Sequence, residues 1–481
     1  MSGSSLLALD LGTTSVRALA VAADGRVLAR AQRPLAARYP RPGWIEQDAE
    51  EMWASAQAVL REALATARLA PRDVAGLGIV TQRSTALAWD ARTLRPLAPA
   101  QSWQDQRTGE RVAGLRAAGI PINTLASATK FEWWMKNDDA VQAAARENRL
   151  RLGTPDTWLA ARLSGGSLHV TDPGNASCTA LYDAAKGEWA QGLLDLFAVP
   201  REALPEIVPT SGVVGETPAE LLGACVPVAA RAGDQQASAF AQGVAKPGDA
   251  KLTLGTSAMF DVHTGDRPPE TVMGAYGLAL WWLPDGTRAF CLEGTVITAG
   301  SAIDWLVELG VAHDAAELSA LAMSVPSSGG LVFVPALQGL GTPFMDDAAR
   351  GALLGITRGS GRAELARAAF EGVAQRCTDV CEAFPLGAGP LRVDGGLAQS
   401  DFLVQALADL SGREIARAKE VETTALGATF LAGLATGVFS DASACAAVIE
   451  PAAPFTPRIG ERARAQSREA WQTALSRVRG R

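Results

Sequence analysis

The sequence predicts an α/β fold made of two similar domains, and three features of the chain lead to this prediction. The chain has 481 residues, which is more than one ordinary hydrophobic core accommodates. Apolar strand-like runs alternate with amphipathic helix-like runs along its length. One strand–turn–strand pattern near residue 7 occurs again near residue 250. Together these features favour two related α/β domains.

The first copy of this pattern is the stretch LALDLGTTSVRAL at Leu7–Leu19. Gly12 permits a tight turn between the two apolar runs. Such a turn directs backbone N–H groups and the hydroxyls of Thr13, Thr14 and Ser15 to one point, as phosphate-binding loops do. Asp10 beside it has the ligand type for a hydrated Mg²⁺ at a polyphosphate. An ordinary hairpin, whose Thr and Ser side chains only satisfy the turn, is the alternative.

The second copy is AKLTLGTSAMFDVHTG at Ala250–Gly265, again an apolar strand, a Gly-Thr-Ser turn and another strand. Just before it, FAQGVAKPGDAK contains Gly243, Pro247 and Gly248, which interrupt the periodic pattern. We therefore expect an N-terminal domain over residues 1–243 and a C-terminal domain over residues 244–481, each with one phosphate loop.

Further elements follow from periodicity and caps. DAEEMWASAQAVLREALATARL has acidic residues in its first turn and predicts a helix. GRAELARAAFEGVAQRCTDVCEAF predicts a long amphipathic helix capped near Ser360. AGLGIVTQRSTALAWD predicts strand, loop and strand, and PLRVDGGLAQSDFLVQALADLSG predicts strand, Gly-Gly turn and helix.

Composition excludes several classes of function. The net charge is −7, from 44 basic and 51 acidic residues, and no Lys/Arg run offers a nucleic-acid footprint. The sequence contains no run of about 18 apolar residues, so we expect no membrane span. The N-terminus lacks the pattern of a signal peptide, so we expect a cytoplasmic protein with reduced thiols.

A metal centre of Cys and His ligands is not expected either. The six cysteines are scattered, and Cys377 and Cys381 form an i,i+4 pair without a second pair at zinc spacing. The three histidines stand far apart in the sequence.

Several motifs in order resemble one known family. DLGTTSVR, RPGWIEQDAEEMW, GIVTQRSTALAWD, SWQDQRT, TKFEWW, HVTDPGNAS, AGDQQASAFAQG and GTPFMDDAARGALLGITRGSGRAELARAAFEG follow one another as in the FGGY carbohydrate kinases, most closely the glycerol kinases. The resemblance extends from about Leu6 to about Gly437. It implies two actin-like, ribonuclease-H-like domains of the sugar kinase and heat-shock chaperone type, with a cleft between them.

The resemblance also implies the substrates and the residues that bind them. It implies transfer of the γ-phosphate of ATP, with Mg²⁺, to a hydroxyl of a small sugar or polyol. Asp10 would serve the metal. The residues implied for ATP are Gly12, Thr13, Thr14, Ser15 and Arg17 in the first loop, Gly255 and Thr256 in the second, and Gly300, Asp304, Gly396 and Ser400 on the adenosine side. Glycerol kinases often have Gln and Asn where this chain has Asp304 and Ser400.

Asp234 in AGDQQ is the candidate catalytic base, because a carboxylate within hydrogen-bond reach can take the proton of an acceptor hydroxyl. The alternative is an aspartate that only begins a helix. Arg83 would bind substrate hydroxyls through its several donors, unless it is a surface arginine. Trp103 would supply an apolar wall and Gln235 a polar partner, whereas Trp133 and Trp134 are expected in packing.

Three pocket positions depart from the glycerol kinase pattern: Ser84 stands for Glu, Leu125 for Tyr and Met259 for Phe. We therefore expect a glycerol-kinase-like enzyme with an altered acceptor pocket. A true glycerol kinase and a kinase of a ketopentose such as xylulose are the alternatives within the family. A non-catalytic ATP-binding sensor is the alternative of a different class, and a homodimer is left open.

Overall fold

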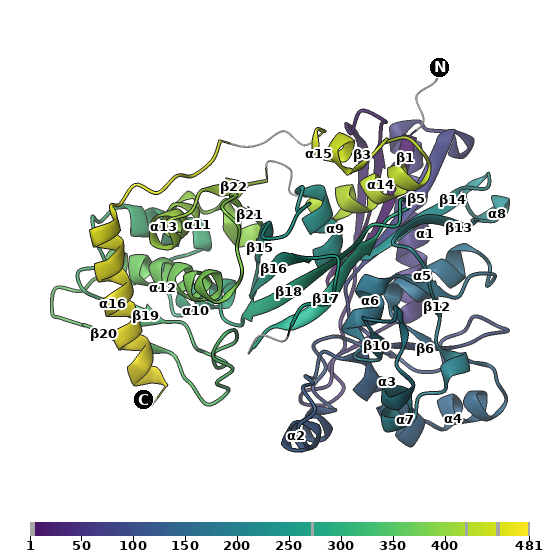
Figure 1. Cartoon of the computed structure of the whole chain (residues 1–481), viewed down its shortest axis with the longest axis horizontal. Helices are drawn as coiled ribbons and strands as arrows, with labels where there is room; N and C mark the ends of the chain where they lie inside the picture. The colour runs from purple at the N-terminus through teal and green to yellow at the C-terminus, as the bar shows by residue number, and fades with distance from the viewer. Residues whose placement is uncertain (1–4, 271–273, 419–421, 449–452, 480–481) are drawn as a thin grey trace.

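The computed structural model describes residues 5–270, 274–418, 422–448 and 453–479. Two six-stranded sheets form its centre, one from each half of the chain, and helices flank both (Figure 1). The α/β class predicted from the sequence is confirmed.

The first sheet has the strand order β13-β14-β5-β1-β2-β3. The strands β1, β2 and β3 form an antiparallel meander, whereas β5 and β14 run parallel to β1. The strands are β1 (Ser5–Leu11), β2 (Ser15–Val21), β3 (Val27–Pro34), β5 (Val74–Thr81), β13 (Ser211–Glu216) and β14 (Pro227–Gly233). All of β1 is buried, as its mainly apolar sequence SLLALDL leads one to expect, and its Asp10 is buried with it.

The second sheet repeats this plan in the order β17-β18-β16-β15-β21-β22. β15, β16 and β18 are antiparallel neighbours, and β21 and β22 run parallel to β15. The strands are β15 (Ala250–Leu254), β16 (Ala258–Gly265), β17 (Tyr276–Trp282), β18 (Arg288–Val296), β21 (Leu391–Asp394) and β22 (Ile415–Arg417). β1 and β15 therefore hold equivalent places, and the internal repeat seen in the sequence is confirmed.

Two helices show how local sequence sets element ends. Helix α1 (Ala49–Ala67) begins after Asp48, whose carboxylate accepts from the N–H groups of Glu50 and Glu51. Helix α12 (Arg362–Ala383) begins after Gly361, next to Ser360, near which the sequence predicted the cap. Glu364 accepts from the Gly361 N–H at 3.0 Å, while the Ser360 hydroxyl accepts from Thr357 N. The N-cap is therefore Gly361, within one residue of the predicted position.

The remaining elements complete the two halves. In the first half they are β4 (Glu46–Gln47), η1 (Pro71–Asp73), β6 (Leu87–Asp90), β7 (Ala100–Gln101), α2 (Gly109–Ala117), α3 (Ser127–Asn137), α4 (Asp139–Arg146), β8 (Leu150–Gly153), α5 (Pro155–Leu163), β9 (Val170–Thr171), α6 (Pro173–Cys178), β10 (Tyr182–Asp183), β11 (Glu188–Trp189), α7 (Gln191–Phe197), η2 (Arg201–Ala203), β12 (Glu206–Ile207) and α8 (Ala219–Leu222). In the rest they are α9 (Asp234–Ala241), α10 (Gly300–Glu308), α11 (Ala315–Met323), β19 (Val332–Val334), β20 (Ala352–Leu354), η3 (Gly396–Gln399), α13 (Asp401–Ser411), α14 (Thr423–Ala435), α15 (Ala442–Ala446) and α16 (Glu461–Val478).

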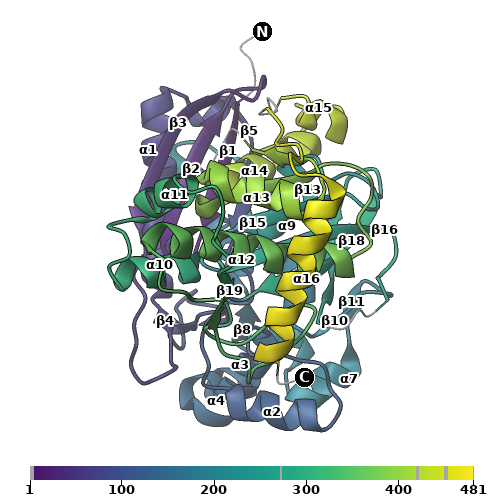
Figure 2. The ribbon, with the colours of Figure 1, turned by 90° about the vertical axis from the view of Figure 1, so that its left-hand side faces the viewer.

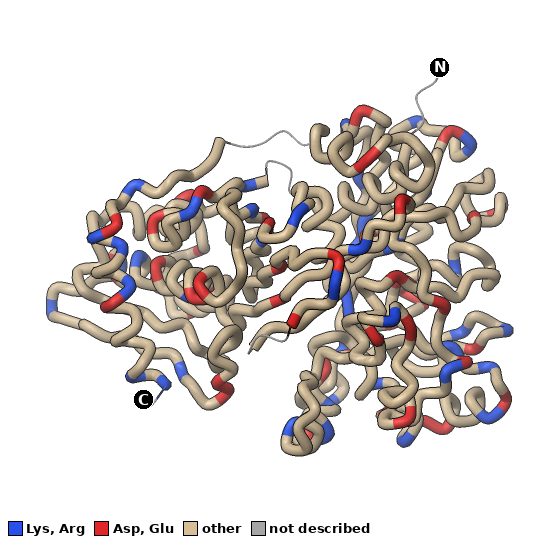
Figure 3. The backbone as a smooth tube through the Cα atoms, viewed as in Figure 1, with Lys and Arg blue, Asp and Glu red and all other residues tan. Residues whose placement is uncertain are grey.

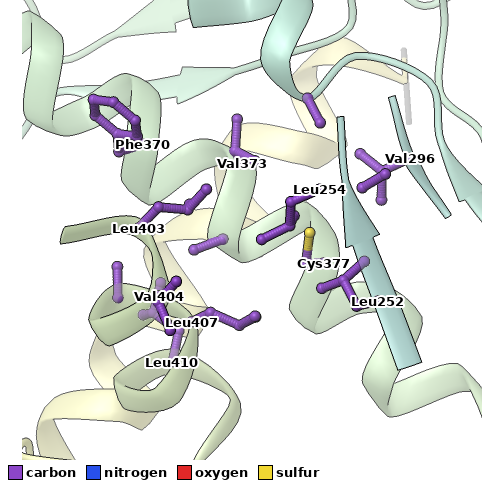
Figure 4. Packing of buried hydrophobic residues seen from close by; sticks show 14 of the residues in the cluster. Leu252, Leu254, Val296, Phe370, Val373, Cys377, Leu403, Val404, Leu407 and Leu410 are labelled. Carbon is purple, nitrogen blue, oxygen red and sulfur yellow. The ribbon is translucent and has the colours of Figure 1, made fainter. Parts of the chain in front are cut away.

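One core lies between the second sheet and the helices α12 and α13 (Figure 4). It contains Leu252, Leu254, Val296, Phe370, Val373, Cys377, Leu403, Val404, Leu407 and Leu410. Cys377 and Cys381 are both buried free thiols on α12. Figure 2 shows the C-terminal helix α16 running across the face of this half of the molecule.

Helix α14 crosses from one half to the other. It follows the second sheet in the chain but packs on α9 and on the first-sheet strands β1, β5 and β14. Its residues Ala425, Phe430 and Leu431 share a buried cluster with Leu6 and Ala8 of β1. The close packing of α14 joins the two halves firmly. The division of the chain at residues 243 and 244 stays a prediction.

Surface composition agrees with an ordinary globular protein. Lys and Arg residues are interspersed with Asp and Glu residues over both halves (Figure 3). Within the described ranges, no helix is both long enough and apolar enough to cross a bilayer. Trp134 is buried in the core, and Trp133 packs edge-on against Trp44, as expected for packing residues.

Candidate active site

The first candidate phosphate loop is the turn between β1 and β2. Asp10 is the penultimate residue of β1 and pairs in register with Arg17 on β2, with Arg17 Nη1 3.5 Å from Asp10 Oδ2. The Gly12 N–H donates to the Ser15 carbonyl at 2.9 Å and closes the turn. The carboxylate, the guanidinium and the hydroxyls of Thr13 and Thr14 therefore gather at one edge of the sheet.

The electrostatics of this turn fit a cation and an anion side by side. Burial raises the pKa of Asp10 to about 7 against the opposing charge of Arg17, and Asp234 and Glu422 add to the rise. Within the described part of the chain, Arg17 Nε is buried without an acceptor. A metal ion beside Asp10 and a phosphate beside Arg17 would compensate both groups, so these residues fit Mg²⁺ and a phosphate chain.

The candidate base lies at the start of α9, directly after β14. Asp234 is the first residue of this helix, and its Oδ1 accepts from the Gln235 N–H at 2.8 Å. Arg83 Nε is 3.2 Å from the same oxygen. The loop after β5 thus brings Arg83 to Asp234, because β5 and β14 are parallel neighbours that end at the same sheet edge.

Arg83 is not a surface arginine, since only 11% of its side chain is exposed. Its Nη1 is 2.6 Å from Glu293 Oε2 of β18, and it lies 3.7 Å from the Cys178 sulfur. Arg83 therefore joins Asp234 of the first half to Glu293 of the second. Burial alone would lower the pKa of Arg83, but the negative charges around it, Glu293 foremost and Asp234 as well, raise this pKa well above the ordinary value for arginine.

Gln235 is held from the second half of the chain as well. Its Oε1 accepts from Lys251 Nζ at 2.6 Å, and this ammonium also donates to Thr253 Oγ1 at 2.8 Å. Lys251 is fully buried on β15. The amide oxygen of Gln235 is thus already used within the protein, which leaves its NH₂ group for a substrate hydroxyl.

Ser84 and Leu125 lie on two loops that are tied together. Ser84 has left-handed backbone dihedrals, with φ of 64°, and its hydroxyl donates to the Cys178 carbonyl at 3.4 Å. Its own carbonyl accepts from Ser127 Oγ at 3.1 Å, at the start of α3. Leu125 is two residues before that hydroxyl. The buried Lys130 donates to the carbonyls of Thr124 and Leu125 and so fixes this loop.

Trp103 and Met259 flank the site from other elements. The Trp103 indole N–H donates to Thr13 Oγ1 at 2.9 Å, which places this tryptophan against the first phosphate loop. Met259 lies on β16 opposite Thr295, whose hydroxyl is 3.3 Å from the Met259 sulfur. Sequence reasoning assigned both residues to the acceptor side. Trp103 therefore also contacts the nucleotide side.

The second candidate phosphate loop packs on the N-terminus of α10. The Gly300 N–H donates to the Gly255 carbonyl at 2.9 Å, and the N–H groups of Ala299 and Ser301 donate to the Thr256 carbonyl. A Cβ atom on Gly300 would lie 2.5 Å from the Gly255 oxygen, so only glycine allows this approach. A helix N-terminus next to a loop of this kind favours an anion.

The other predicted adenosine-side residues lie on neighbouring elements. Gly396 begins η3, and a Cβ there would meet open space, whereas Gly395 packs on the Leu254 carbonyl at the end of β15. Asp304 is exposed on α10. The Ser400 hydroxyl caps α13 and lies 2.8 Å from the Ser319 hydroxyl, so it is engaged within the fold.

Several charged residues of this region were not expected from the sequence. They are Lys251, Asp261, Glu293 and Asp394. Asp394 ends β21 and accepts hydrogen bonds from Gln242, Thr253 and Thr423, which joins α9, β15 and the start of α14. The signal that could have identified them is a single charge inside an otherwise apolar strand, as in MFDV and CLEG.

A separate hollow of about 640 Å³ opens on the first half of the molecule. It is lined by residues such as Arg38, Asp48, Glu50 and Arg162, none of which belongs to the site. Arg38 pairs with Asp48 and Arg162 pairs with Glu50, so these arginines are already neutralised. The converging polar groups around Asp10, Arg83 and Asp234 identify the site better than this hollow does.

Comparison with known proteins agrees with the family resemblance seen in the sequence motifs. Residues 5–241 match the family model described as the FGGY family of carbohydrate kinases, N-terminal domain, and residues 250–436 match the C-terminal domain of that family. A glycerol kinase of Aromatoleum aromaticum is 44% identical over 490 residues, covering 99% of each chain. A glycerol kinase of Thermus brockianus is 41% identical, covering 99% of this chain and 98% of that protein.

Solved structures are similar over the same length. A Plasmodium falciparum glycerol kinase with ADP has a TM-score of 0.93 at 25% identity, covering 99% of this chain and 98% of that one. A xylulose kinase from Rhodospirillum rubrum has a TM-score of 0.85 at 26% identity, covering 99% of this chain and 100% of that one.

Proposed function

The chain belongs to the FGGY family of carbohydrate kinases, and on this premise we propose a catalytic site built on Asp234, Arg83 and the two phosphate loops. The protein is an ATP-dependent phosphotransferase whose acceptor is an alcohol group of a small sugar or polyol. The observation that supports the site is the contact of Arg83 with Asp234, 3.2 Å apart at the ends of two parallel strands.

In the proposed reaction, an acceptor hydroxyl attacks the γ-phosphorus of ATP. Asp234 takes the hydroxyl proton as the new oxygen–phosphorus bond forms and the bond to the β-phosphate oxygen breaks, releasing ADP. Arg83 and the free NH₂ group of Gln235 hold the acceptor hydroxyls. Because Arg83 is anchored by Glu293 at 2.6 Å, its remaining donors are held in a fixed direction.

The nucleotide side is proposed from the two turns and the N-terminus of α10. Arg17 and the hydroxyls of Thr13 and Thr14 would contact phosphates from one side, and Gly255 and Thr256 from the other. Gly300 permits close approach of backbone and Gly396 borders open space, whereas Asp304 and Ser400 are the weaker assignments. Mg²⁺ held through Asp10 would neutralise charge that develops on the transferred phosphoryl group.

For the acceptor, we propose a compound other than glycerol. Ser84 carries no charge and is bonded to the Cys178 carbonyl, and Leu125 carries no hydroxyl, so two partners that a small polyol would use are absent from these positions. Met259 adds a flexible apolar surface. The second candidate is glycerol itself, which is favoured by glycerol kinases that are 39–44% identical to this chain.

The test is a screen of purified protein with MgATP against glycerol, D-xylulose and other polyols and ketoses, measuring ADP release. Acceptor-dependent ADP release is expected, with glycerol a poor acceptor. A protein that binds ATP but releases ADP at the same rate with and without every acceptor would be a nucleotide sensor and would contradict the proposal.

We further expect the protein in the cytoplasm, in keeping with its six free cysteines. The domain limits at 1–243 and 244–481 and a homodimeric state remain proposals for limited proteolysis and for light scattering to test.

A further inference from the structure

Two acidic side chains face each other on neighbouring strands behind the acceptor site. Asp261 of β16 and Glu293 of β18 are directly paired in the antiparallel register. They are 1% and 6% exposed, and as directly paired residues of an antiparallel pair their side chains stand next to each other on the same face of the sheet. Each carboxylate has a cationic neighbour, Arg83 for Glu293 and Lys251 for Asp261, but two ionised carboxylates side by side still repel each other, and this repulsion favours one proton shared by the pair.

The pair is continuous with the proposed acceptor site. Met259 and Asp261 are two residues apart on β16, so their side chains lie on the same face of the strand. Glu293 contacts Arg83, and Asp261 Oδ2 lies 3.4 Å from Lys251 Nζ, which in turn holds Gln235. The contacts therefore form a ring. It runs from Asp234 to the residue after it, Gln235, by way of Arg83, Glu293, Asp261 and Lys251.

Apart from the Lys251 ion pair, no hydrogen-bond donor within the described residues reaches either oxygen of Asp261. A buried carboxylate without donors is costly, and a proton shared with Glu293 removes that cost. The lack of other donors is a second observation, independent of the strand register, that links Asp261 to Glu293.

We propose that Asp261 is a positioning residue for the phosphoryl transfer: through a carboxyl–carboxyl hydrogen bond to Glu293, it fixes Arg83 in the acceptor site. This rests on the proposed role of Arg83 in acceptor binding. When the shared proton is lost, repulsion within the pair displaces Glu293, and Arg83 loses its anchor. Acceptor binding then weakens as pH rises, while ATP binding does not.

All titratable groups around the pair agree with a single shared proton. Burial raises the pKa of Glu293 against the charge of Arg83, and Asp261 adds to the rise. The other facing groups are Asp234, Lys251 and the thiols of Cys178 and Cys291. Burial raises the pKa of the Cys178 thiol to about 12 and that of Cys291 well above its ordinary value, so both stay neutral.

The test compares wild type with Asp261→Asn, whose amide donates to Glu293 at every pH. Asp266→Asn, an exposed aspartate just beyond the same strand, is the matched control. With glycerol and D-xylulose as acceptor probes, the acceptor KM of wild type and of the control should rise about tenfold between about pH 6 and 8.5. That of Asp261→Asn should change less than about twofold, and the KM for ATP should be unaffected in all three. Parallel acceptor profiles for wild type and Asp261→Asn would overturn the proposal.

A second measurement does not depend on the acceptor or on activity. The folded pair keeps a proton that the unfolded chain has released, so the thermal stability of wild type should fall as pH rises from about 4.5 to about 7. Asp261→Asn should show a smaller fall in Tm than wild type and Asp266→Asn. Identical Tm–pH curves would show that no proton is shared, even if the kinase activity and the role of Asp234 are established.

Glu293→Gln provides the complementary variant. It keeps the side-chain shape but removes the negative charge that anchors Arg83, so the acceptor KM should rise at least tenfold at every pH. An unchanged acceptor KM in Glu293→Gln would mean that Glu293 does not hold Arg83 for binding.

Discussion

The indole N–H of Trp103 donates a hydrogen bond of 2.9 Å to the hydroxyl of Thr13. Trp103 follows β7, whose Gln101 pairs with Ala86 just after Arg83 and Ser84, whereas Thr13 belongs to the first candidate phosphate loop. The Gln47 side chain also donates to the Thr13 carbonyl at 2.7 Å, so the loop is held from two sides. One side chain therefore connects the proposed acceptor wall with the proposed phosphate site.

Replacing Trp103 by Phe should reduce kcat/KM for ATP about fivefold. The ring and its apolar surface are kept, but one neutral hydrogen bond to the phosphate loop is lost, which costs about 1 kcal/mol. Steady-state kinetics at saturating acceptor measure this effect.

Trp44→Phe serves as the control, because Trp44 packs on Trp133 and Arg107 away from Thr13. The idea fails if both variants change kcat/KM for ATP equally.

Asp234→Asn should lower kcat about 10²-fold or more, the usual scale for loss of a positioned base. The shape is kept, and the Asn carbonyl still accepts from the Gln235 N–H. ADP affinity, measured by calorimetry, should therefore stay within about twofold of wild type. If turnover remains near normal, another group takes the proton.

The repeated fold and the grouping of much of the candidate site could be predicted because their signals are local. The Gly-Thr turns after buried strands lie in sequence order at Asp10–Ser15 and Gly255–Ser257, and the sheets then place them at equivalent ends of β1 and β15. Asp234 was recognisable because it follows an apolar strand and begins a helix. The order of the motifs supplied the family.

The contacts between the halves could not be predicted, since they depend on residues distant in the chain. Asp261 and Glu293 are 32 positions apart, and only the β16–β18 register makes them neighbours. The anchoring of Gln235 by Lys251 depends on how α9 packs beside β15. Helix α14 on the first sheet is likewise a tertiary result, because its sequence is apolar on every side.

Activity should fall as pH decreases through about 7, because Asp10 then becomes protonated. Burial raises its pKa to about 7, above the ordinary 3.8, and a neutral carboxyl does not attract a cation. The pH profile of kcat/KM for MgATP should show this group, and excess EDTA should abolish turnover. Turnover that persists in EDTA would contradict a metal role for Asp10.

The raised pKa of Asp10 also predicts how the stability of the fold changes with pH, and this change is opposite in direction to the change in activity. The folded pKa of Asp10 exceeds the unfolded value, so the folded state keeps a proton between these values and stability falls as pH rises from about 4 to 7. Asp10→Asn should therefore be more stable than wild type above pH 7, by about 4 kcal/mol, and equally stable near pH 4. Thermal melts at the two pH values test this. A variant less stable than wild type at high pH would exclude the burial argument.

The acceptor prediction concerns Ser84 and Leu125 together, whose loops are joined by the Ser127 hydroxyl at the Ser84 carbonyl. A polyol site pairs each hydroxyl with a fixed partner, and an unpaired buried hydroxyl costs about 1–3 kcal/mol.

The double variant Ser84→Glu with Leu125→Tyr supplies a carboxylate acceptor and a phenol, and it fills the space that the smaller side chains leave. Glutamate keeps the left-handed backbone at position 84 no more easily than serine does, so thermal melts should accompany the kinetics. If the variant is folded, kcat/KM for glycerol should rise about tenfold or more, equivalent to about 1.4 kcal/mol, while kcat/KM for any larger acceptor falls. The expectation is wrong if the unmodified enzyme already phosphorylates glycerol with kcat/KM of about 10⁴ M⁻¹s⁻¹ or more, since backbone groups or water would then replace the missing partners.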